Sequence, residues 1–166
     1  DKLYLIETTL DAEISFGDQN ILDTKASLAQ RERQLAIDSL DYTQQVEAAK
    51  GMVTVEQFKK YQEERLKLVD EYNKKQQKID ESSAKAARDQ ATGNFRENLK
   101  KEFSEEFVAS EEGKALITKF GLNAEEEYQV KLKEIKQKYN KENDANAKKS
   151  EQEVLDFRLA QLDKFN

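Results

Sequence analysis

No proline interrupts the 166 residues of this chain, and only five of them are glycine. Proline breaks an α-helix because it lacks the backbone donor and clashes with the preceding turn, so its absence permits long continuous helices. The apolar share is 37%, yet 28 basic residues nearly balance 34 acidic ones, which argues against a disordered chain. The sequence therefore predicts an all-α fold, with long antiparallel helices that form an elongated helical bundle or coiled coil.

The residue types that carry most enzyme chemistry are missing. The chain has no histidine and no cysteine, which removes the commonest general base, the thiol nucleophile and the usual transition-metal ligands. It also lacks a glycine-rich phosphate loop and an EF-hand pattern. The dense carboxylates Glu105-Glu106 and Glu125-Glu126-Glu127 are adjacent residues that point to different helix faces, so they cannot converge as a catalytic pair. We expect no enzyme activity, no cofactor, no metal site and no small-molecule substrate.

Charge and hydropathy also bear on the partners of the chain. The net charge is −6, and the lysine-rich segment 131–138 is interleaved with Glu134, which argues against nucleic-acid binding. No apolar run approaches the ~18 residues of a membrane span. The chain begins at Asp1 rather than Met and shows no signal peptide, which suggests a fragment or a processed product. The lack of cysteine leaves the redox compartment undetermined.

Local signals divide the chain into helices. Gly51 suits a left-handed helix end, and Thr54-Val55-Glu56-Gln57 matches a capping box that starts the next helix. Gly93 predicts a break, Ser110 a fresh helix start, and Gly121 a second break after which Glu125–Glu127 occupy the first turn of the last helix. We therefore predict a single helical region over 1–166, with helices at about 5–49, 55–91, 95–108, 111–120 and 124–165.

Apolar residues at helical spacing predict the helix-packing interface. The clearest pattern is a row in which Ile14, Ile21, Leu28, Leu35 and Tyr42 recur every seven residues. The positions three residues further on are polar, Arg31 and Asp38 among them, so the row favours packing on neighbouring helices over a strong two-stranded zipper. The other predicted packing residues are Phe58, Tyr61, Leu68, Tyr72, Phe95, Leu99, Phe103, Tyr128, Leu132, Ile135, Tyr139, Leu155 and Leu162.

Two interpretations of these apolar rows remain open. They form the core of a monomeric bundle, or they face identical or different chains in an assembly. Helices of this length with polar gaps exceed what a compact domain needs, which favours some apolar surface for partners. We therefore expect protein partners or self-association through helices.

One stretch carries a family resemblance. Gly121-Leu122-Asn123-Ala124-Glu125-Glu126-Glu127-Tyr128, continued by Ile135 and Tyr139 and echoed from Gly51 to Phe58, resembles the charged helical stretches of phage tail tape-measure proteins. The resemblance implies a structural protein of the tail tube that sets tube length during assembly, located in the virion tail, with no catalytic site. Without that resemblance, the expected location is simply soluble.

The sequence thus predicts a non-catalytic structural or scaffolding protein that acts through helix–helix contacts. The alternative is a helical binding module, such as a Skp-like holdase chaperone that grips unfolded clients between helical arms.

Overall fold

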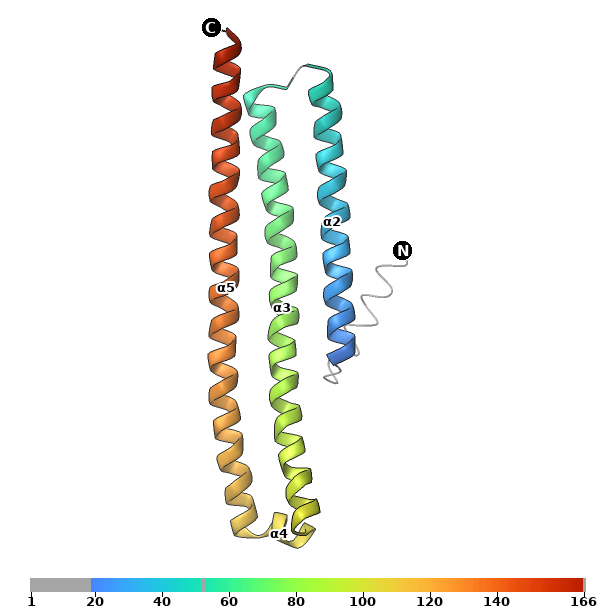
Figure 1. Cartoon of the computed structure of the whole chain (residues 1–166), viewed down its shortest axis with the longest axis vertical. Helices are drawn as coiled ribbons and strands as arrows, with labels where there is room; N and C mark the ends of the chain where they lie inside the picture. Colours follow the sequence, from blue (N-terminus) through green and yellow to red (C-terminus); the bar gives the residue numbers. More distant parts are fainter. Residues whose placement is uncertain (1–18, 52, 166) are drawn as a thin grey trace. The chain divides into compact units, whose positions relative to one another are not determined.

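The structure, a computed structural model, describes residues 19–51 and 53–165, and the side chains of 23–51 and 53–164. These residues form helices α2 (Gln19–Ala49), α3 (Val55–Glu102), α4 (Glu105–Ala109) and α5 (Glu111–Phe165), as Figure 1 shows. No strand occurs within these described ranges, and the predicted all-α fold is confirmed. The predicted first helix begins before the described part, so its residues 5–18 lie outside it.

The chain divides into two compact units. The first unit combines residues 78–136 with the start of α2 up to Thr24, and it contains α4. The second unit combines Lys25–Gln77 with residues from Gln137 onward, so it holds most of α2, the first half of α3 and the second half of α5. Each unit has its own interior, and the two interiors are built differently.

The turn between α2 and α3 follows the sequence prediction. Gly51 has a φ of 72°, the left-handed conformation in which glycine carries no Cβ penalty. At the start of α3, the Gln57 amide donates to the Thr54 hydroxyl at 3.1 Å, and the Thr54 amide donates to Gln57 Oε1 at 2.9 Å. This reciprocal capping box satisfies two backbone donors that the first helical turn would leave without partners.

Two predicted helix breaks are wrong. Helix α3 continues through Gly93, and α5 continues through Gly121, so the predicted helices 55–91 and 95–108, and likewise 111–120 and 124–165, are not separate at those points. A glycine inside a helix costs only about 1 kcal/mol relative to alanine, which packing contacts on both sides offset. Phe95 stacks on Phe120 and Arg88 bonds Glu125, so contacts flank both glycines.

The true interruption lies between α3 and α5. Helix α3 ends at Glu102, Ser104 caps α4 by accepting the Phe107 amide at 3.0 Å, and Ser110 accepts the Gly113 amide at 3.1 Å. The predicted helix start at Ser110 is therefore confirmed. The predicted helix 95–108 is interrupted between Glu102 and Glu105, where α3 ends and α4 begins. Glu125–Glu127 lie inside α5 rather than in a first turn.

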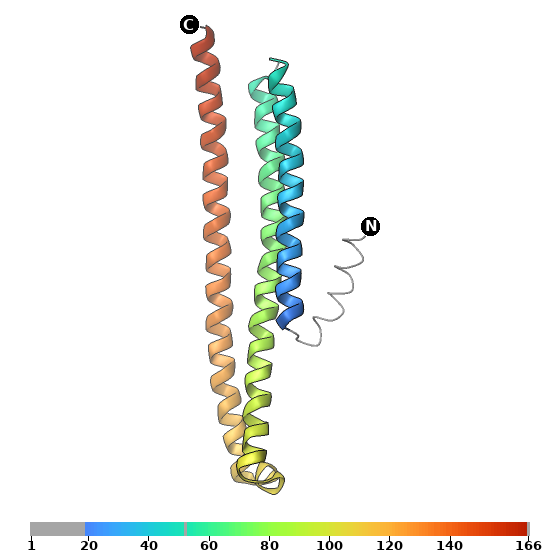
Figure 2. The same cartoon turned by 45° about the vertical axis from the view of Figure 1, so that its right-hand side comes forward.

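Within each unit, the neighbouring helices run antiparallel. In the second unit, α3 contacts both α2 and α5, and its partners on α5 fall in sequence number as α3 advances: Phe58 meets Phe157, Gln62 meets Glu153, and Asn73 meets Asn143. In the first unit, Arg88 meets Glu125 and Phe95 meets Phe120 in the same sense. Figure 2 shows these helices side by side in a second view.

Candidate helix-packing interface

The interior of the second unit is centred on a buried amide. Asn73 on α3 exposes only 2% of its surface. Its Nδ2 donates to Asn143 Oδ1 on α5 at 2.9 Å, and its Oδ1 accepts from the Arg33 guanidinium on α2 at 3.4 Å. A buried polar group is tolerated when its hydrogen bonds are made, and here they are made to two different helices. Asn73 therefore fixes where α2 and α5 lie along α3.

A second buried amide lies three helical turns earlier on α3. Gln62 donates from Nε2 to Glu153 Oε2 at 2.7 Å, and its Oε1 accepts from the Ser150 hydroxyl at 3.3 Å. Both partners belong to α5. A shift of α5 by one residue would leave these groups unpaired, so the pair specifies register in the same way as a buried asparagine in a coiled coil.

A charged cluster joins α2 to α3. Asp41 Oδ1 accepts from the Tyr61 hydroxyl at 2.6 Å and from Arg65 Nε at 3.2 Å. Burial, reinforced by the bond to Asp41, raises the pKa of Tyr61 to about 12. The phenol therefore stays a donor across the physiological range. Nearby, the Lys75 ammonium lies 3.5 Å from Glu32, which adds a second ion pair between the same two helices.

These polar groups border a cavity of about 260 Å³ between α2, α3 and α5. Its lining includes the cations Arg33, Arg65 and Lys149 and the carboxylates Asp41 and Glu153. Arg33, Arg65 and both carboxylates already bond other side chains of the unit. Three cations thus face two carboxylates, and most of these groups bond side chains on a neighbouring helix. We therefore interpret the charged lining as a set of contacts that align the three helices.

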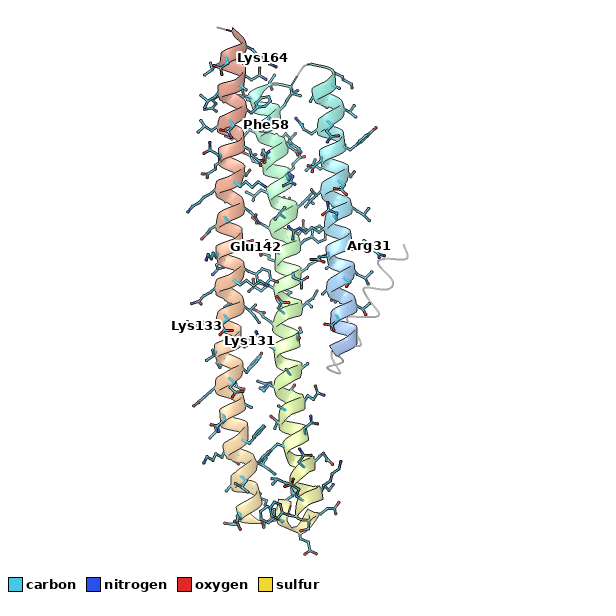
Figure 3. All side chains as sticks on the ribbon, in the orientation of Figure 1. Arg31, Phe58, Lys131, Lys133, Glu142 and Lys164 are labelled. Carbon is cyan, nitrogen blue, oxygen red and sulfur yellow. The ribbon has the colours of Figure 1, made fainter. Side chains whose placement is uncertain are left out.

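Aromatic contacts join α3 to α5 in both units. Phe58 stacks on Phe157 of α5 with ring centroids 4.3 Å apart, and Figure 3 shows Phe58 at the α3–α5 seam. In the first unit, Phe95 stacks on Phe120 at 4.2 Å. Such pairs contribute about 0.5 to 1.5 kcal/mol beyond the area they bury. Buried Leu99 adds an aliphatic contact to the first unit.

Arg88 is the polar anchor of the first unit. Its guanidinium donates to Glu125 Oε2 at 2.7 Å and lies 4.3 Å from the centroid of the Tyr128 ring. Hydrogen bonds from Gln129 and then Arg88 hold the pKa of Glu125 below its ordinary value. The carboxylates at 125–127, which the sequence assigned to a helix start, thus include one that ties α5 to α3.

The predicted packing residues fall into three groups. Leu99, Ile135 and Tyr139 are buried. Those that are half-buried are Leu28, Phe58, Tyr61, Leu68, Tyr72, Phe95, Tyr128 and Leu132. Those that are exposed are Leu35, Tyr42, Phe103, Leu155 and Leu162. Ile14 and the side chain of Ile21 lie outside the described part of the chain.

Sequence reasoning missed the polar interior. The predicted packing residues do not include Gln62, Asn73, Arg33 or Asn143. A signal existed, because Gln62, Leu66, Val69 and Asn73 share one α3 face at spacings of three and four. That face alternates polar and apolar side chains, so a search for apolar rows alone could not find it.

Two rows of exposed apolar side chains complete the interface. On α2, Leu35 and Tyr42 expose 57% and 68% of their surface, and Val46 continues the row. On α5, Leu155, Leu159 and Leu162 are also exposed. Both rows follow the spacings of a helix-packing face, yet neither is covered by the described helices of its unit.

Comparison with protein-family models, with curated proteins and with solved structures gives no match. None of the described helices is both long and apolar enough to cross a membrane. Among the residues that the structure describes, no group of three or more acidic side chains is placed to hold a metal ion.

Proposed function

We propose that the chain is a non-catalytic structural or scaffolding protein that acts through helix–helix contacts. The observation that carries the proposal is the outward row on α2, where Leu35 and Tyr42 are among the most exposed large apolar side chains. Apolar side chains gathered on a helix face cost solubility unless another surface covers them, so they mark sites of protein contact.

The polar interior supports the same proposal. Asn73 and Gln62 on α3 donate hydrogen bonds to α5, and Asn73 also accepts one from Arg33 on α2. These bonds set the register of α2 and α5 against α3, and therefore the positions of the two outward rows relative to each other. A scaffold needs this fixed spacing because its partners bind at repeated positions along its helices. Hydrogen bonds between buried amides supply specificity of alignment rather than large net stability.

The tape-measure resemblance gives the proposal its most specific form. In that form, the helices belong to the tail tube of a phage and contribute to the length of the tube during assembly. Neighbouring genes that encode tail-tube and baseplate proteins would support this form, and a gene neighbourhood without phage structural genes would contradict it.

The general proposal is tested by association of the purified chain. Light scattering after size exclusion should show assemblies that grow with concentration. Two variants test which row mediates the contact: Leu35→Lys with Tyr42→Lys on α2, and Leu155→Lys with Leu159→Lys on α5. At least one of them should abolish association while the helicity measured by circular dichroism stays unchanged. A chain that is monomeric at every concentration, or that associates regardless of both variants, would contradict the proposal.

A holdase chaperone is the second candidate, favoured by the three exposed leucines of α5, which offer a sequence-tolerant apolar surface. Its test is suppression of aggregation of an unfolded client at stoichiometric ratio. Protection that disappears with the α5-row variant would support the chaperone function. Lack of protection by the wild-type chain would remove it.

A further inference from the structure

We propose that two copies of this chain pair through the outer face of α2, antiparallel and related by a two-fold axis at Leu35. The inference rests on the proposed function and deepens it, because it names the partner of one row as a second copy. The row, defined here as Leu28, Leu35, Tyr42 and Val46, is called the outer row of α2.

The outer row lies opposite the face that α2 turns to its own unit. Successive helical residues rotate by about 100°, so Ile37 and Arg33, two positions from Leu35, lie about 160° around the helix from it. Ile37 is buried and Arg33 bonds Asn73, whereas Leu35 is exposed. Figure 3 shows Arg31, a close neighbour of the outer row, on the side of α2 away from α3. The described helices therefore leave Leu35 and Tyr42 uncovered on this face, while Leu28 is half-buried.

The spacing of the outer row is self-complementary. A two-fold axis at Leu35 brings together residues that stand equally far before and after it. Leu28 and Tyr42 are each seven residues from Leu35, so each Leu28 meets the Tyr42 of the other copy, and Leu35 meets itself. Three apolar layers result, about 10 Å apart along the helices.

The charges beside the row match the same register. Arg31 lies four residues before Leu35 and Asp38 three residues after it, which places both on one flank, about 40° and 60° around the helix. An antiparallel two-fold axis keeps that flank on the same side in both copies, so each Arg31 faces the Asp38 of the other copy. Neither side chain forms an ion pair within the described part of the chain.

The exposed row of α5 does not offer this match. With Leu159 at the two-fold axis, Asp156 and Asp163 occupy one flank, three residues before and four residues after it. The same antiparallel pairing would set these two carboxylates against each other. Like charges disfavour such pairing, so the copies are expected to meet through α2 rather than α5.

Cysteine cross-linking tests the pairing, because the natural chain has no cysteine to interfere. Under mild oxidation, Leu35→Cys should form a disulfide dimer with itself. Leu28→Cys and Tyr42→Cys should cross-link when mixed and far less when separate. Ser39→Cys is the matched control, since its two copies would stand about 12 Å apart along the helices and should stay uncross-linked.

A charge swap tests the register independently. Arg31→Glu replaces two attractions by two repulsions and should weaken dimerisation about tenfold in sedimentation equilibrium at low salt. The double variant Arg31→Glu with Asp38→Arg should restore wild-type dimerisation. Dimerisation that is unaffected by Arg31→Glu, or not restored by the double variant, would overturn the pairing.

The outcomes separate this inference from the general proposal. A chain that associates without a Leu35→Cys dimer, and that loses association with the α5-row variant, overturns the α2 pairing and leaves helix-mediated scaffolding in place. A chain that stays monomeric overturns both the α2 pairing and the general proposal. This holds whether the outer row is then exposed to solvent or covered by another part of the same chain.

Discussion

The interiors of the two units are built from different kinds of side chains. Among the described residues, the buried polar side chains, Gln62 and Asn73, both belong to the second unit. The buried side chains of the first unit within the described ranges are aliphatic, Ile79, Leu99, Val108 and Ile135, and Arg88, which bonds Glu125, is only partly buried. The second unit buries apolar side chains as well, Ala29, Ile37, Val69 and Tyr139, and adds buried amides whose hydrogen bonds specify alignment.

Both units also expose large apolar side chains, those of the first unit being Phe103, Leu116, Leu122 and Val130. In the second unit, amides and charged groups occupy the seams of α2, α3 and α5, while leucine, tyrosine and valine line the outer row of α2. An inner face that fixes register and an outer apolar face are what the proposed scaffolding function requires. The first unit, with its interior of aliphatic and aromatic contacts, is the more conventional solution.

The largest expected effect comes from placing a polar residue in the apolar interior. Leu99→Asn in the first unit removes buried aliphatic contacts and leaves an amide without partners, so it should destabilise the chain by about 4 kcal/mol. Urea denaturation followed by circular dichroism measures the change. Tolerance of this substitution would show that the interior of the first unit accepts polar groups as the second unit does.

The converse substitution should have a smaller effect. Asn73→Leu leaves Asn143 and Arg33 without their partner, and we expect a loss of about 2 kcal/mol in the free energy of unfolding. The double variant Asn73→Leu with Asn143→Leu should recover the part of this loss that comes from Asn143, because two apolar groups replace a bonded pair, while Arg33 still lacks its partner. A double variant as unstable as the single one would remove Asn143 as the relevant partner.

Two glycines of α5 provide a matched pair of substitutions. A Cβ on Gly113 would overlap the Phe107 carbonyl oxygen, so Gly113→Ala should cost about 2 kcal/mol. A Cβ on Gly121 meets open space inside α5, so Gly121→Ala should stabilise the chain by about 0.5 to 1 kcal/mol. Thermal melts of both variants test this. Melting temperatures that shift in the same direction for both variants would contradict the roles assigned to the two glycines.

The smallest predicted effect is a pH dependence in the second unit. Burial raises the pKa of Asp70, only partly opposed by Lys74, and its Oδ1 lacks a hydrogen-bond partner among the described residues. A raised pKa means that the folded chain holds this proton more tightly than the unfolded chain, so the carboxylate lowers stability once the pH exceeds about 4.

Asp70→Asn removes that charge without a change of size. The variant should therefore melt slightly above wild type at neutral pH, and the difference should vanish below about pH 3.5, where Asp70 is protonated in both states. Melting temperatures across this range provide the measurement. A difference that grows as the pH falls would mean that the ionised Asp70 is stabilised in the folded chain.

Local signals in the sequence predicted what depends on a few adjacent residues. The capping box at Thr54 and the left-handed Gly51 were readable because their geometry is set within four residues. The breaks at Gly93 and Gly121 were wrong because a weak helix penalty was weighed without the contacts that Phe95 and Arg88 make across the unit.

The orientation of α2 was beyond local reasoning. Its most regular row contains Leu28, Leu35 and Tyr42, and apolarity alone suggests that such a row faces inward. Ile37 and Arg33 define the inner face instead, because Ile37 is buried and Arg33 bonds Asn73 on α3, which in turn bonds Asn143 on α5. Hydrogen-bond partners of this kind are visible only once the helices are placed together.

The measurement that tests the account most directly is the distance between nitroxide labels on two copies of α2. With labels placed singly by cysteine substitution at Ser27, Thr43 or Ser39, the antiparallel pairing predicts equal axial separations of about 24 Å for Ser27 and Thr43 and about 12 Å for Ser39. Equal, short distances at all three positions, or no distance between chains at all, would contradict it.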